Sequence, residues 1–234
     1  MIAPATLCEW LMARGLTPQP ADLWGDFIAD ALELLFDSHT LLRTPDEWAS
    51  FLNGCHRQQP TEPEITSGLG DRIRRLRHEA PIDSDRDRIH FSYESPTPGD
   101  HSQGIRKSRA DFRFERKFEA GRAAAFVMEA KPLRTPADLT GRYLGAEGLG
   151  CFTDRDPPYS TDLAAGMVGY AFRDAPTWLG RLASALPTNT MATQIADVIL
   201  TGGRNAVASD HPRAGGLNPV TVIHAVLDFV EAQT

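Results

Sequence analysis

Two charged patterns separated by a turn constrain the fold of this chain more than any other feature. In the first, Asp111 begins an alternation that places Phe112 and Phe114 on one face of a strand. In the second, an apolar run ends on Glu129-Ala130-Lys131, with both charged side chains on one face. Buried charges are costly unless they are paired or hold a metal. Charged groups at the polar end of such strands therefore indicate a site.

The spacing of the two patterns predicts a β-hairpin. Residues 119–122 (Glu-Ala-Gly-Arg) form a plausible turn between the strands. Antiparallel neighbours bring Asp111 and Glu129 together if the register is suitable. Two carboxylates can hold Mg²⁺ through oxygen ligands, and Lys131 can orient the attacking water and offset charge on a phosphate. These parts suit metal-assisted hydrolysis of a phosphodiester.

This pattern, an acidic residue on one strand and Glu-x-Lys on the next, resembles the PD-(D/E)XK, or restriction-endonuclease-like, nuclease superfamily. Residues 62–66, followed by Leu69 and Ile73, resemble its first core helix, which often carries a further acidic residue. Glu64 is the position that matches. The resemblance implies Asp111, Glu129 and Glu64 as metal ligands, and Mg²⁺, replaceable by Mn²⁺, as cofactor.

The resemblance covers residues 62–186. Residues 163–172 resemble the fourth core strand and residues 175–186 the helix that follows it. Ala110 stands where the superfamily's name has proline, and Leu139 stands where some members have the glutamine of Gln-x-x-x-Tyr, although Tyr143 is present. The implied fold is α/β, with a restriction-endonuclease-like core in which a central mixed sheet is flanked by helices.

The chain has 234 residues, enough for one large domain or for one domain with a smaller helical extension. Apolar residues at helical spacing predict helices between Ala5 and Asn53. A polar stretch with two prolines, residues 56–63, marks a boundary. We therefore expect an N-terminal helical extension at 1–58 and the nuclease-like core at 59–234.

The net charge of −7 argues against a protein that coats nucleic acid through its overall charge. Local basic groups are the alternative. Arg72 and Arg75 lie on the predicted helix after Glu64, where they either contact phosphates or form a solvated face paired with nearby acids. Arg106, Lys107 and Arg109 precede Asp111 and would lie beside the metal site as substrate-binding residues.

Three scattered cysteines, Cys8, Cys55 and Cys151, suit neither a zinc site nor a disulfide framework. We expect them to be reduced thiols in a cytoplasmic protein. Residues 1–10 lack the pattern of a signal peptide, and no run approaches the length of a membrane span.

In the last part of the chain, residues 191–199 read as a helix and residues 220–230 as a strand. His211 and His224 could approach a substrate phosphate, although isolated histidines are commonly structural.

The predicted function is that of a Mg²⁺-dependent, endonuclease-like phosphodiesterase that cuts DNA in preference to RNA. The resemblance implies a role in restriction, repair or phage defence. The N-terminal helices are, separately, a candidate surface for a homodimer or another protein partner. The alternative is a non-catalytic nucleic-acid-binding or assembly subunit in which Lys131 merely neutralises Asp111 and Glu129.

Overall fold

The computed structural model describes residues 5–57, 59–97, 100, 108–119, 122–200 and 203–230. Within them the chain forms one mixed sheet of eight strands in the order β1-β6-β7-β8-β5-β4-β3-β2. The strands are β1 (Ala5–Thr6), β2 (His90–Pro96), β3 (Arg109–Glu119), β4 (Arg122–Leu133), β5 (Ala164–Ala171), β6 (Gln194–Ile199), β7 (Asn205–His211) and β8 (Val220–Asp228). The predicted α/β class with a mixed sheet is confirmed.

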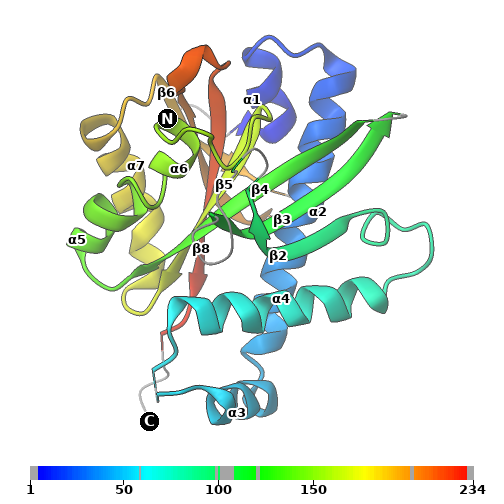
Figure 1. The fold of residues 1–234 in the computed structure, drawn as a ribbon, viewed down its shortest axis with the longest axis vertical. Helices are drawn as coiled ribbons and strands as arrows, with labels where there is room; N and C mark the ends of the chain where they lie inside the picture. The colour runs from blue at the N-terminus through cyan, green and yellow to red at the C-terminus, as the bar shows by residue number, and fades with distance from the viewer. Residues whose placement is uncertain are drawn as a thin grey trace.

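Helices cover both faces of this sheet (Figure 1). They are α1 (Leu7–Ala13), α2 (Pro18–Leu42), α3 (Pro45–Gly54), α4 (Glu62–His78), α5 (Pro136–Asp138), α6 (Gly150–Thr153) and α7 (Trp178–Asn189). A π-helix, η2 (Leu139–Tyr143), follows α5, and short 3-10 helices span Ala175–Thr177 and Ala214–Gly216. Figure 1 shows α5, α6 and α7 to the left of the sheet, α2 on its other side, and α4 running below β2 and β3.

The centre of the sheet is parallel and its flanks contain antiparallel pairs. β4, β5 and β8 are parallel neighbours, whereas β2-β3-β4 on one side and β6-β7-β8 on the other are antiparallel. The predicted hairpin is confirmed, because β3 pairs with β4 from Phe112↔Met128 to Glu119↔Arg122. Alternation along these strands sends Phe112, Phe114, Phe126 and Met128 into one hydrophobic core, while Val127 belongs to the core on the opposite face.

One prediction about the C-terminal part is wrong. The segment expected to be a helix through Ile195, Val198 and Ile199 is strand β6, which pairs with β1 on one side and β7 on the other. The spacing of these three apolar residues fits a helix, but their β-branched side chains favour a strand. Pairing with the neighbouring strands selects the strand. β8 is found where a strand was expected.

The N-terminal helices are part of the main core. Trp24, Phe27 and Ile28 of α2 belong to the same hydrophobic cluster as Ile65 of α4 and Phe114 of β3. The domain boundary expected at 58/59 falls between α3 and α4. Across this boundary α2 packs directly on α4 and on side chains of the sheet.

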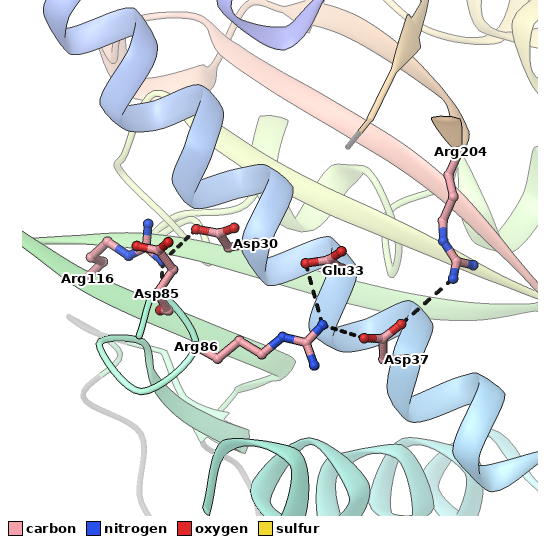
Figure 2. A network of polar contacts seen from close by, with 7 residues as sticks. All are labelled: Asp30, Glu33, Asp37, Asp85, Arg86, Arg116 and Arg204. Atoms are coloured by element: carbon pink, nitrogen blue, oxygen red, sulfur yellow. Dashed lines mark hydrogen bonds and ion pairs between the residues drawn. The ribbon is translucent and has the colours of Figure 1, made fainter. Parts of the chain in front are cut away.

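An acidic row along α2 is held by arginines from three other segments (Figure 2). Arg116 of β3 contacts Asp30 at 2.7 Å and donates to the carbonyl oxygen of Asp85 at 2.9 Å. Further along α2, Arg86 contacts both Glu33 and Asp37, and Asp37 also faces Arg204. The Arg116 side chain is 12% exposed and that of Arg86 is 31% exposed. Exposed ion pairs contribute little to the free energy of unfolding. Arg116, the more buried of the two, should therefore contribute more than Arg86.

This difference gives a stability test. Arg116→Met leaves Asp30, whose pKa is raised by burial, without its cation. We expect a loss of about 1–3 kcal/mol in the free energy of unfolding, against about 1 kcal/mol or less for Arg86→Met. Urea denaturation of both variants measures it, and equal losses would contradict the assignment.

Candidate active site

The candidate site lies where β3 and β4 separate. Pairing between β3 and β4 ends at Phe112↔Met128. Just beyond this pair, the Ala130 amide donates a hydrogen bond of 2.7 Å to the Asp111 carboxylate and not to a backbone carbonyl of β3. On its other side β4 stays paired with β5 as far as Leu133↔Ala171. The Asp111 side chain thus replaces a backbone partner, which brings its carboxylate beside Glu129.

Three carboxylates meet at this point. One oxygen each from Glu62, Asp111 and Glu129 lies within 4.8 Å of the others. The Lys131 ammonium lies 2.7 Å from Glu129 Oε1 and 2.8 Å from Glu62 Oε1. The structure therefore brings together the predicted Asp111, Glu129 and Lys131, and adds Glu62 from the first turn of α4.

Glu64, the expected third ligand, lies elsewhere. Its carboxylate accepts hydrogen bonds from the Thr61 amide at 2.7 Å, the Thr61 hydroxyl at 2.7 Å and the His56 amide at 2.8 Å. These bonds, with that from the His56 amide foremost, lower the pKa of Glu64 to about 2. Glu64 thus closes the capping box at the start of α4, and Glu62 takes the place expected for it. The Thr-x-x-Glu pattern of 61–64 is a sequence signal for this cap.

Burial and mutual repulsion dominate the electrostatics of the group. The Glu129 side chain is 7% exposed, and burial, reinforced by the Asp111 charge, raises its pKa. Burial also raises the pKa of Asp111. Burial opposes the charge of Lys131, but the carboxylates of Glu129, Glu62 and Asp111 outweigh it and raise the pKa of this ammonium.

One oxygen of this group is without a partner. Glu129 Oε2 is buried and accepts no hydrogen bond from the described residues. Such an atom costs free energy unless something satisfies it. Carboxylate oxygens are the ligands that Mg²⁺ and Mn²⁺ prefer, so Glu62, Asp111 and Glu129 fit a divalent cation in both charge and chemistry.

The backbone of β2 is irregular beside Asp111. Pairing with β3 runs from His90↔Glu115 to Pro96↔Arg109 but skips Glu94, which has a φ of 49°. A non-glycine residue in the left-handed region carries strain, which tends to occur at functional sites. Glu94 adds negative potential here, because its charge contributes to raising the Asp111 pKa.

The expected substrate-binding cations are only partly placed at the site. Arg109 is exposed at the start of β3, two residues before Asp111. Arg106 and Lys107 lie outside the described residues. Arg72 and Arg75 both bind Glu47 of α3, at 2.7 Å and 2.8 Å, so they link α3 to α4. For these two arginines the structure favours an ion-paired helix face.

The two C-terminal histidines belong to a buried polar chain. His224 Nδ1 lies 3.2 Å from Tyr143 Oη, and His224 Nε2 lies 2.7 Å from Ser209 Oγ. His211 Nε2 lies 2.7 Å from the same Ser209 oxygen. Burial lowers the pKa of both histidines, which keeps them neutral. Their contacts give them a structural role on the α7 side of the sheet.

Comparison with known proteins adds no relative: no family model, no curated protein and no solved structure matches this chain. Cys8, Cys55 and Cys151 are all free of disulfides. Among the described residues, no helix combines the length and apolarity required to cross a bilayer.

A matched pair of substitutions tests whether Glu62 or Glu64 serves the cation. Glu62→Gln should weaken Mn²⁺ binding about tenfold or more, because even a group that only orients a ligand is worth about 10–100-fold in metal affinity. Glu64→Gln removes the same charge but keeps the cap in a neutral form, so affinity should be unchanged. Calorimetric titration of both variants decides, and the reverse order would restore Glu64 as the ligand.

Proposed function

We propose that this chain is a Mg²⁺-dependent phosphodiesterase with a restriction-endonuclease-like core, and that it cuts nucleic acid. The observation that carries the proposal is the buried, unpartnered Glu129 Oε2 within a group of three carboxylates. A purely structural cluster has no need for an oxygen left without a donor. The order of parts also supports it: α4 carries Glu62, β3 carries Asp111, and β4 carries Glu129 and Lys131.

Each residue then has a defined task. Glu62, Asp111 and Glu129 would hold the cation, and the Ala130 amide fixes the direction of the Asp111 carboxylate. The bound cation would polarise the scissile phosphate and make water more acidic. Lys131 supplies a positive charge at the same point, and in the metal-free protein the carboxylates of Glu129, Glu62 and Asp111 outweigh burial and raise the pKa of this ammonium. It can orient the nucleophile and stabilise charge developing on phosphate oxygens.

DNA rather than RNA, endonuclease activity and a role in restriction, repair or phage defence are parts of this proposal that rest on the superfamily resemblance. A homodimer or a protein partner on the N-terminal helices is a further part of the proposal, and it rests on the N-terminal helical segment itself. A cytoplasmic location rests on the three unpaired cysteines. Arg109, exposed two residues before Asp111, is a described cation that would meet a phosphate.

The alternative is a non-catalytic binding or assembly subunit, and one observation favours it. Lys131 is already paired with Glu129 and Glu62 at hydrogen-bonding distance, as a structural ion-pair cluster requires. The charge balance weighs against it, because one ammonium does not compensate three ionised carboxylates, and burial with the remaining repulsion raises the pKa of both Glu129 and Asp111. Replacing such a cluster by apolar residues is commonly neutral or stabilising, so a structural role alone does not account for it.

Cleavage assays separate the two proposals. Labelled linear duplex DNA, single-stranded DNA and RNA are each incubated with the protein over a Mg²⁺ and Mn²⁺ series. We expect metal-dependent cleavage of DNA that falls about 100-fold or more in Asp111→Asn, the scale of losing one group that stabilises the transition state.

The charge-matched control is Glu115→Gln on the same strand, since Glu115 is paired with Arg113 and is not one of the three clustered carboxylates. It should cleave like the parent. Cleavage that persists in Asp111→Asn would contradict the assigned site. The absence of cleavage together with the absence of metal binding would favour the binding-subunit alternative.

A further inference from the structure

We infer that Lys131 is the internal counter-ion of the metal-free site, and that a divalent cation and this ammonium compete for the same glutamates. Metal binding would then loosen Lys131 from Glu129 and make its donors available to substrate. This inference rests on the proposed function, because it concerns the same cation site. It adds that metal binding is coupled to the release of Lys131 from Glu129.

The contacts of Lys131 carry the first step. Its Nζ is within hydrogen-bonding distance of Glu129 Oε1 and Glu62 Oε1, at 2.7 Å and 2.8 Å. Both glutamates belong to the carboxylate group that fits a cation. The side chain of Lys131 is 10% exposed, so solvent screens this charge weakly. The ammonium therefore occupies part of the coordination space that a metal would use.

Charge supplies the second step. With all three carboxylates ionised and no metal present, Lys131 is held by three negative charges. A divalent cation among the same oxygens reduces that net negative charge to one and places a second positive centre a few ångströms from the ammonium. At such separations in a partly buried site, repulsion between like charges far exceeds thermal energy. The electrostatic attraction of Lys131 to Glu129 and Glu62 must therefore weaken.

Linkage makes the effect reciprocal. If the metal weakens the contacts of Lys131, then Lys131 weakens metal binding by the same factor. Glu129 Oε2 is a ligand atom that Lys131 does not occupy, since it accepts no hydrogen bond from the described residues. The exchange can begin there without first breaking the contact of Lys131 to Oε1.

The parent protein itself provides the first readout. The chain has only three lysines, Lys107, Lys117 and Lys131. Labelling lysine with ¹³C therefore gives three Cε signals, which sense the surroundings of the ammonium. On titration with Mg²⁺, without substrate, we expect the Lys131 signal to move and saturate, while that of Lys117, exposed on β3, stays in place. A stationary Lys131 signal under saturating Mg²⁺ would overturn the inference.

Calorimetry gives the second readout. At a fixed pH of 8.5, Lys131→Met should bind Mg²⁺ about tenfold more tightly than the parent or better, because a repelling charge has been removed. Lys117→Met carries the same change of charge at an exposed position of β3 and should match the parent.

The outcomes separate the two levels of the account. Equal or weaker binding by Lys131→Met, with normal binding by the parent, refutes the competition and leaves the metal-dependent function standing. No Mg²⁺ binding by either protein refutes both. Tighter binding together with lost cleavage is the expected result, since the variant keeps the cation ligands but lacks the ammonium.

Discussion

The separation of β3 from β4 at Asp111 is the constraint on which the candidate site depends. A continued ladder would pair the Ala130 amide with backbone, but here it donates to the Asp111 carboxylate. That single bond turns Asp111 toward Glu129 and leaves three carboxylates with one ammonium between them. The concentration of negative charge that results is unfavourable in a buried position, and under the proposed function a divalent cation would relieve it.

The rest of the fold holds these groups in place. Glu62 reaches the site because the capping box of Thr61 and Glu64 fixes where α4 begins. Ile65 and Leu69 anchor the same helix in the core, and Arg72 and Arg75 tie it to α3 through Glu47. On the other side of the cluster, parallel pairing of β4 with β5 keeps Glu129 and Lys131 on a strand of the central sheet. Helix capping, core packing, ion pairs and strand pairing together fix the positions of Glu62, Glu129 and Lys131.

Local patterns in the sequence predict much of this arrangement. The alternation around Phe112 and the apolar run before Glu129 give the hairpin, and they bring Asp111, Glu129 and Lys131 together correctly. The superfamily resemblance predicts Glu64 as the further acidic residue of the site, whereas the structure places Glu64 in the helix cap that begins at Thr61 and Glu62 in the carboxylate group. The strand at β6 was missed because its pairing with β1 and β7 is a long-range property that periodicity does not contain. The partners of Arg72 and Arg75 are likewise set by where α3 packs.

The most direct test of the central claim is anomalous diffraction from crystals of the protein soaked in Mn²⁺. The account predicts a single strong anomalous peak within coordination distance of Glu62, Asp111 and Glu129, with Glu129 Oε2 among the ligands. An empty cluster at full Mn²⁺ saturation, with Lys131 still bound to both glutamates, would contradict it. The three carboxylates and the lysine would then be a structural ion-pair network, and the metal-dependent mechanism would fall.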